Sequence, residues 1–501
     1  MSVTVRTRAQ VGIEAPPVLV EAHCLPGTPS FTLVGMAQTA VREARDRVRS
    51  AIRNVGLKFP QGRLVVNLAP ADLAKHGGRY DLAIAVAILA TTKQVDSRHL
   101  DRLEFLGELS LYGEVRAIQG AFCAATKLNG RDRGLVVASS QRQELAPLAG
   151  VNIYPAATLK DVFRLLQAPE LPETQPLILP LPSHHPGESL SDVRGQAKAK
   201  RALAVAAAGG HHLLMTGPPG TGKTMLARRL AGLLPRLGDD EAIEVANVYS
   251  VSTRKAPAFG LRPFCDPHHT ASLAAMVGGG NPIAPGEITL AHRGVLFLDE
   301  LPEFQRNVLE ALREPLEAGD VAVARVKQTV RYPARFQLVA AMNPCPAGYI
   351  CDEAHCRCTP HQVRQYSSRI SGPLLDRIDI RVEVGPVPEQ DLWGAPPPAS
   401  QDADVRAKVS TAWARQMTRA GKMNAHLAGR EIERYSTLAA PAATLLRRAA
   451  KRFRLSARAV HRLRKVALTI ADLAGKDETA SAHVAEALTF RAFDEESAAD
   501  D

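Results

Sequence analysis

A glycine-rich segment near the middle of the chain has the residue types and spacing of a phosphate-binding loop. It lies between an apolar run and a helix-forming stretch, and it consists of Gly217, Pro218, Pro219, Gly220, Thr221, Gly222, Lys223 and Thr224. Glycines let backbone N–H groups converge on phosphate oxygens, and the following helix adds the positive end of its dipole. Lys223 is placed to reach the β- and γ-phosphates, and the Thr224 hydroxyl to hold Mg²⁺. The segment therefore predicts ATP and Mg²⁺ as cofactors.

Polar side chains that could act on the γ-phosphate follow two further apolar runs. Asp299 and Glu300 end the run 294–298, and Asn343 follows the run 336–342. Such runs are typical of buried parallel strands, whose carboxyl ends meet at one edge of a sheet. We expect Asp299 to hold Mg²⁺, Glu300 to polarise the attacking water and Asn343 to position it. Together with the phosphate-binding loop, these groups resemble the ATP site of AAA+ ATPases.

Length and net charge indicate how many domains the chain has and what kind of partner it binds. Its 501 residues suggest about two to four domains, and a net charge of +11 favours a polyanionic partner such as nucleic acid. No apolar run approaches the roughly 18 residues of a membrane span, and the N-terminal residues lack the apolar core of a signal peptide. We therefore expect a cytoplasmic protein without a membrane partner.

Residues 1–166 are expected to form an α+β domain. Segments 107–120 and 134–138 resemble the proteolytic domain of Lon proteases, which has a ribosomal S5-like fold. That resemblance implies a serine and lysine pair, but residues 75–82 contain no serine and no lysine directly follows Gly120. Because nucleophilic catalysis needs both groups, the domain should be a scaffold without peptidase activity. Apolar patterns within it predict strands at 18–22, 31–34 and 64–68, helices at 39–55 and 82–89, and a hairpin over 104–115.

Proline-rich stretches separate the remaining parts. Residues 167–189 should form an extended linker, 190–388 an AAA+ ATPase core, and 389–501 a helical lid with an acidic tail. The expected fold class is thus α/β, an AAA+ core with a helical lid after a Lon-protease-like domain. The core contains two adjacent histidines at 268–269, for which metal ligation is disfavoured because chain neighbours rarely share one ion. The glycines after Val277 predict a mobile loop reaching into a pore.

Alternating residues on both sides of 327–328 predict a β-hairpin with a basic tip, preceded by a helix over 307–315. Such a hairpin resembles the pre-sensor hairpin of the helicase-type AAA+ clade, which includes magnesium-chelatase motor subunits and minichromosome maintenance helicases. Arg325 and Lys327 are then the expected DNA contacts. Downstream, the segment 434–471 has many basic and no acidic residues, which favours an anionic partner.

Segments 267–272, 294–304 and 333–346, with the domain order, resemble the ComM/YifB family of magnesium-chelatase-like AAA+ ATPases. The resemblance implies a homo-hexameric, ATP-driven helicase that binds single-stranded and branched DNA. It further implies branch migration during natural transformation, with recombinase and competence proteins as partners. A metal-chelatase motor subunit that does not act on DNA is the alternative, and a Lon-type protease is disfavoured by the missing pair.

Two arginines are assigned roles through the same resemblance. Arg377, within 371–379, matches an arginine finger that enters the ATP site of the neighbouring subunit. Its alternative is an ion pair with Asp376 or Asp379. Arg458 matches the sensor-2 arginine, which touches the nucleotide.

Four clustered cysteines suggest a third cofactor. Within fourteen residues lie Cys345, Cys351, Cys356 and Cys358, which could close a Cys₄ Zn²⁺ site. Their intervals differ from the usual C-x₂-C pairs, so a loop that tolerates cysteines is the alternative.

Overall fold

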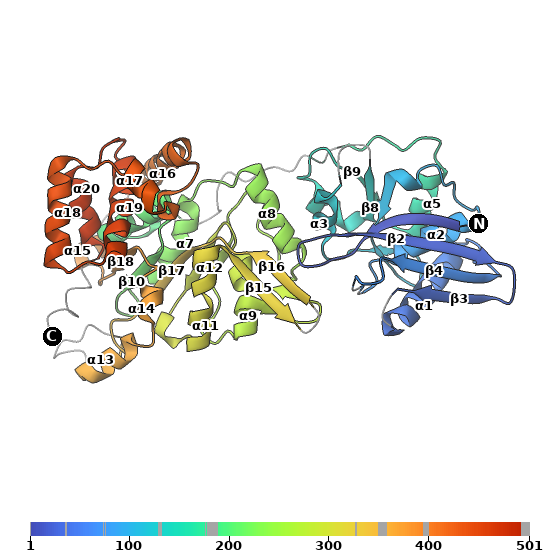
Figure 1. Ribbon diagram of the computed structural model, residues 1–501, viewed down its shortest axis with the longest axis horizontal. Helices are drawn as coiled ribbons and strands as arrows, with labels where there is room; N and C mark the ends of the chain where they lie inside the picture. The colour runs from blue at the N-terminus through green and yellow to red at the C-terminus, as the bar shows by residue number, and fades with distance from the viewer. Residues whose placement is uncertain are drawn as a thin grey trace.

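The computed structural model describes residues 2–35, 38–73, 75, 77–128, 133–175, 177, 189–325, 328–348, 358–393 and 400–491. The chain is elongated, with an N-terminal domain at one end, a parallel-sheet core in the middle and a helical lid at the other end (Figure 1). Among the described residues, no helix is long and apolar enough to cross a bilayer.

A mixed seven-stranded sheet forms the N-terminal domain. Its order is β3 (Ser30–Val34), β4 (Arg63–Ala69), β2 (Pro17–Leu25), β1 (Ser2–Arg8), β5 (Leu103–Phe105), β8 (Gly134–Ala138) and β9 (Asn152–Ala156). The helices are α1 (Gln38–Asn54), α2 (Asp81–Thr91), α3 (Ala121–Thr126), α4 (Arg142–Leu145) and α5 (Leu159–Gln167). Helix α2 is buried along its whole length, because it packs on β1 and β2 and is covered by α1. The strands and helices predicted for this domain are confirmed.

The hairpin predicted over 104–115 is wrong in part. Only β6 (Glu108–Leu109) and β7 (Val115–Arg116) pair as a hairpin, whereas β5 joins the large sheet beside β1. Glu104 is buried there, and its carboxylate lies 2.5 Å from the guanidinium of Arg8 on β1. A buried, paired acid looks in the sequence like an exposed one, which explains the error.

Five parallel strands form the sheet of the core. Their order is β11 (Phe264–Cys265), β14 (Val295–Leu298), β17 (Gln337–Met342), β10 (Leu213–Thr216) and β18 (Ile380–Glu383). All residues of β14 and β17 are buried, and all of them except Gln337 are apolar. Helices α6 (Ala197–Gly209), α7 (Lys223–Leu233) and α8 (Asp239–Ser250) complete this part of the core.

Two antiparallel hairpins extend from the core. The predicted hairpin is confirmed as β15 (Asp320–Arg325) and β16 (Gln328–Pro333); Lys327 and the side chain of Arg325 lie outside the described residues. The glycines after Val277 do not form an open loop, because β12 (Gly278–Gly279) pairs with β13 (Ala284–Pro285). Gly278 has a φ of +111°, and a Cβ there would lie 2.6 Å from the Ala284 carbonyl oxygen. The close approach of the two backbones therefore explains why glycine occupies position 278.

The helix predicted over 307–315 is two short helices, α11 (Arg306–Ala311) and α12 (Arg313–Ala318). Pro315 explains the break, because it cannot donate a hydrogen bond to Ala311 and its ring disfavours a continuous helix. Further helices are α9 (Leu273–Val277), α10 (Glu287–Leu290), α13 (Pro360–Ser367), α14 (Gly372–Leu375) and α15 (Glu389–Trp393). The lid consists of α16 (Ser400–Ala420), α17 (Gly429–Tyr435), α18 (Ala440–Arg452), α19 (Ala457–Leu473) and α20 (Ser481–Thr489).

The N-terminal domain packs directly on the core. Ser250 at the end of α8 satisfies the first turn of α3, since its carbonyl accepts the Gly120 N–H at 2.7 Å and its hydroxyl the Phe122 N–H at 3.1 Å. A second contact joins the turn around Gly12 to β16, where a Cβ on Gly12 would lie 2.3 Å from the Val330 methyl group. One buried apolar cluster continues across the boundary.

This close contact at Gly12 predicts that the packing of the N-terminal domain on β16 contributes to the stability of the protein. Gly12→Ala should lower the free energy of unfolding, because the added methyl group collides with Val330 and overpacking costs about 1–3 kcal/mol. Gly56→Ala is the matched control, since Gly56 also has a positive φ, of +81°, but nothing within 4 Å of its Cβ position. Chemical denaturation of both variants checks this; equal losses would contradict the close contact.

Candidate nucleotide site

The phosphate-binding loop stands in the predicted context. Strand β10 ends at Thr216, and α7 begins at Lys223. Gly217 approaches the residue after β18 so closely that a Cβ would lie 2.0 Å from the Val384 carbonyl oxygen, and Gly220 and Gly222 have φ values of +78° and +87°. These glycines are therefore required by packing and by backbone conformation.

Lys223 joins the loop to the end of β17. Its ammonium group donates to the carbonyls of Gly217 at 2.7 Å and Pro218 at 2.8 Å, and to the Asn343 side-chain oxygen at 3.2 Å. Burial lowers the pKa of Lys223, while the charges of Asp299 and Glu300 act in the opposite direction. The structure thus brings Lys223 and Asn343 together, as the sequence predicts.

Thr224 and Asp299 form an oxygen pair suited to a hard cation. The Thr224 hydroxyl donates to the Asp299 carboxylate at 2.6 Å, and the other carboxylate oxygen accepts the Glu300 N–H at 2.9 Å. Mg²⁺ is usually held by one or two such groups together with phosphate and water. The residues present therefore fit the magnesium ion that a nucleotide would bring.

Glu300 is held by a residue whose role the sequence reasoning missed. It has a φ of +52°, uncommon outside glycine, and its carboxylate lies 3.0 Å from Nδ1 of His269. His269 follows β11, which lies beside β14, so the strand order brings the two side chains together. The only signal in the sequence is the histidine pair itself, 268–269, whose type points first to metal ligation.

Arg377 lies at the opposite edge of the sheet. It precedes β18, whereas the phosphate-binding loop follows β10, and these two strands are parallel neighbours. Its guanidinium donates to the Pro373 carbonyl at 2.6 Å and contacts Glu317. The alternative pairs are therefore wrong: Asp376 pairs with Arg462 at 3.4 Å, and Asp379 contacts His211 at 2.8 Å.

Arg458 lies with Arg377 rather than with the phosphate-binding loop of its own chain. Both line a cavity of about 590 Å³ together with Arg462, Lys465 and His212. His212 immediately precedes β10, so this cavity is at the amino edge of the sheet, away from the loop that follows β10. Burial lowers the pKa of His212 to about 4.

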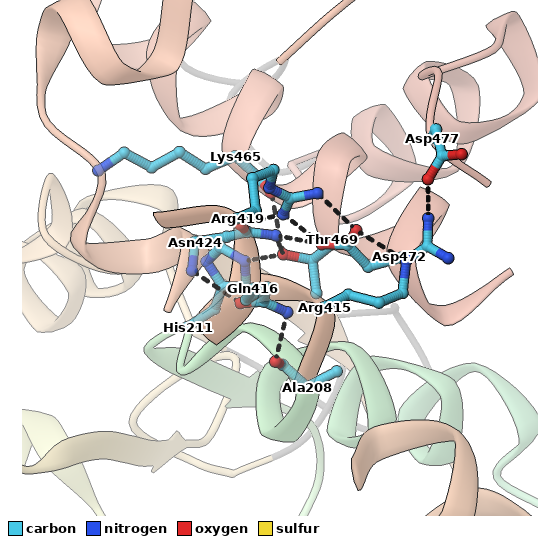
Figure 2. A network of polar contacts seen from close by, with 10 residues as sticks. All are labelled: Ala208, His211, Arg415, Gln416, Arg419, Asn424, Lys465, Thr469, Asp472 and Asp477. Carbon is cyan, nitrogen blue, oxygen red and sulfur yellow. Dashed lines mark hydrogen bonds and ion pairs between the residues drawn. The ribbon is translucent and has the colours of Figure 1, made fainter. Parts of the chain in front are cut away.

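A buried polar network fixes the lid against this edge (Figure 2). His211 contacts Asp379 at the start of β18 and the Thr469 hydroxyl of α19, each at 2.8 Å. Asn424 donates to Thr469 at 3.0 Å and to Asp472 at 2.9 Å. The network therefore links the amino ends of the core strands to α19, the lid helix that carries Arg458.

The cysteine cluster is described only in part. Cys345 is buried and Cys358 half-buried, while Cys351 and Cys356 lie outside the described residues. Within the described ranges, no group of three or more histidine, cysteine or acidic residues could hold a metal ion. The zinc site stays a prediction.

Three family signatures cover most of the chain. Residues 20–141 match "Subunit ChlI of Mg-chelatase", 189–392 match "Magnesium chelatase, subunit ChlI" and 399–491 match its C-terminal part. These matches and the parallel sheet define a magnesium-chelatase-like AAA+ protein, a class that implies ATPase activity with ATP and Mg²⁺.

Full-length relatives narrow the family. The chain is 47% identical to competence protein ComM of Haemophilus influenzae, covering 98% of this chain and 97% of that one, and 46% identical to the uncharacterized protein YifB of Escherichia coli at the same coverage. The magnesium-chelatase 38 kDa subunit of Rhodobacter capsulatus is 27% identical over 44% of this chain and 67% of its own. The chain therefore belongs to the ComM/YifB family.

The contacts of Lys223 and the position of Glu300 predict that substitutions at these two residues affect nucleotide binding and ATP hydrolysis separately. Lys223→Ala should abolish nucleotide binding, because the ammonium would contact the phosphates of the bound nucleotide already in the ground state. Glu300→Gln should keep binding and slow hydrolysis on the order of a hundredfold or more, as loss of a general base does. Titration with a fluorescent ATP analogue and phosphate release measure the two effects. An unimpaired Glu300→Gln variant would refute the role given to this carboxylate.

Proposed function

We propose that this protein is an ATP-driven motor that assembles as a homo-hexameric ring, moves on DNA and promotes branch migration of recombination intermediates. Single-stranded and branched DNA are its substrates, and recombinase and competence proteins its partners in the cytoplasm. The name of the Haemophilus relative supports a role in competence. The N-terminal domain acts in this proposal as a Lon-like scaffold without protease activity.

The observation that carries the proposal is the position of Arg377. The nucleotide groups lie at the carboxyl ends of the strands, and Arg377 lies before β18 at their amino ends. A second copy of the chain could present Arg377 to the γ-phosphate, where an arginine stabilises charge in the transition state. Arg458 shares the cavity of Arg377, so it would reach the same neighbouring nucleotide.

Unpaired cations on the lid support an anionic substrate. Within the described part of the chain, no acidic partner lies within 4 Å of the exposed basic groups at the end of α18 and just beyond it, which are Arg447, Arg448, Lys451, Arg452 and Arg454. Clustered, uncompensated cations are the electrostatic footprint of nucleic-acid binding. The hairpin β15–β16 would add Arg325 and Lys327 inside the ring.

A metal-chelatase motor that does not act on DNA is the second candidate. The match of residues 189–392 to magnesium-chelatase subunit ChlI favours it, since the same ATPase core would serve both. Such a motor has no need of basic lid and hairpin surfaces. Stimulation of ATP hydrolysis by DNA, falling steeply with salt, distinguishes the two.

The trans role of Arg377 predicts complementation between two inactive variants. Rings mixed from Arg377→Ala and Lys223→Ala subunits should recover part of the hydrolysis rate, because some interfaces then pair an intact phosphate-binding loop with an intact arginine. Each variant alone is the control. Absence of recovery in rings shown by native mass spectrometry to be mixed would argue against an arginine acting between subunits.

The basic hairpin predicts that strand separation can be lost without loss of ATP hydrolysis. The double variant Arg325→Ala and Lys327→Ala should lose strand separation and branch migration while hydrolysing ATP without DNA. The salt dependence of DNA binding should weaken by about one unit of slope for each phosphate contact removed. Arg458→Ala should instead lower hydrolysis with and without DNA.

Arg331→Ala is the matched control for the hairpin. Arg331 lies on β16 away from the tip and pairs with Asp320 at 3.5 Å. It should therefore retain strand separation. Full unwinding by the double variant would make the hairpin a structural element only and would favour the chelatase-like alternative.

A further inference from the structure

Helix α1 of the N-terminal domain presents a row of arginines to solvent. One side of the helix is buried in the domain through Val48 and Ile52, whose side chains are fully covered. Arg45, Arg49 and Arg53 are exposed and recur every four residues. On a helix this spacing gives one row of side chains, with steps of about 6 Å along the axis. The row therefore forms a line of positive charge on the surface.

The charge of this row is not balanced within the protein. Arg47, on another side of α1, lies 2.6 Å from the Asp81 carboxylate and 3.6 Å from that of Glu43. Asp46 is exposed beside the row. In the part of the chain that the structure describes, however, neither it nor any other acidic side chain comes within 4 Å of the three arginines of the row. Exposed cations without such partners are available to an anionic ligand.

An exposed tyrosine lies next to the end of the row. Asn54, the last residue of α1, donates from its side chain to the Leu111 carbonyl at 2.7 Å. Tyr112 follows Leu111 and is 79% exposed. The turn is closed by the Gly113 N–H, which donates to the Ser110 carbonyl at 3.0 Å, so the backbone of Tyr112 is fixed. A ring presented from a fixed backbone loses little conformational freedom on binding.

We propose that the α1 surface, which consists of Arg45, Arg49, Arg53 and Tyr112, binds single-stranded DNA. The arginines contact phosphates and the tyrosine ring stacks on a base, a combination that holds single strands without reading their sequence. Arg49 is oriented for this, since its guanidinium lies 5.5 Å from the centroid of the Phe59 ring. The α1 surface belongs to the N-terminal domain, at the end of the molecule opposite the lid (Figure 1), so it is separate from the basic groups of the lid. The choice of DNA as the polyanion rests on the proposed function, whereas the binding itself needs neither nucleotide nor hydrolysis.

The arginine row is tested by binding of a labelled oligothymidylate to the full-length protein without nucleotide, followed by fluorescence anisotropy. The triple variant Arg45→Gln, Arg49→Gln and Arg53→Gln should bind more weakly. Its salt dependence should fall by about two units of slope, because each phosphate contact to a single strand contributes about 0.7. Glutamine removes the charge and keeps most of the aliphatic stem, so the packing of the helix is retained. Unchanged ATP hydrolysis without DNA establishes that the variant is folded.

The matched control removes three other exposed arginines of the same domain. It is the triple variant Arg102→Gln, Arg142→Gln and Arg164→Gln, whose residues lie on other elements than α1. Net charge falls equally in both triple variants, so a general attraction between the basic protein and DNA weakens equally in both. The control should bind within about twofold of the wild type. Equal losses in the two variants would overturn the α1 surface.

The tyrosine separates a single strand from other polyanions. Tyr112→Ala should lower the affinity for oligothymidylate on the order of tenfold, as loss of one stacked base does, while Tyr112→Phe keeps the ring and should bind like the wild type. Duplex DNA should bind Tyr112→Ala as well as the wild type, since its bases are already stacked on one another. Unchanged binding of oligothymidylate by Tyr112→Ala would reduce the α1 surface to a general anion contact and overturn its assignment to single strands.

Unwinding of forked DNA by the wild type distinguishes failure of the α1 surface from failure of the proposed function. If the wild type unwinds and the arginine and tyrosine variants bind oligothymidylate normally, only the α1 surface is overturned. If these variants lose binding but the wild type neither unwinds forked DNA nor hydrolyses ATP faster with it, the motor function is refuted and the α1 surface is supported.

Discussion

In a parallel sheet all strands begin at one end and finish at the other, and this asymmetry governs how the nucleotide site can be completed. Strands β10 and β18 run in register from Leu213 with Ile380 to Thr216 with Glu383. Lys223 follows the carboxyl end of one strand and Arg377 precedes the amino end of the other, so the length of the strands, about 10 Å from first to last Cα at 3.3 Å per residue, lies between the ends from which they extend. One subunit is thus not arranged to present both groups to the same nucleotide. In the proposed ring, the arginine comes from the neighbouring subunit instead.

Buried polar contacts add to the apolar packing that joins the lid to the sheet. His211, between α6 and β10, bridges Asp379 at the head of β18 and Thr469 in α19. Since a buried polar group left without its partner costs about 1–3 kcal/mol, the lid cannot rotate without losing several such bonds. Arg377 and Arg458 belong to elements that this network joins. Their shared cavity is therefore a consequence of how the lid is held.

The sequence was sufficient where function follows from local pattern. Lys223, Asp299 and Asn343 each follow an apolar strand, and parallel strands align their ends, so their meeting could be predicted without long-range information. The contact between His269 and Glu300 could not, because β11 has only two residues and no periodicity reveals it. The place of Arg458 was equally hidden, since it depends on buried contacts between residues more than two hundred positions apart.

Strand β16 is an element at which the N-terminal domain meets the core. Val330 lies against Gly12 of the N-terminal domain, and two residues later the Tyr332 hydroxyl binds Ile283 in the segment that leads back to His269. Because these side chains sit in one buried cluster, the strand cannot move without disturbing both neighbours. The contact at Gly12 therefore ties the position of β16 to that of the N-terminal domain, so that neither can shift independently of the other.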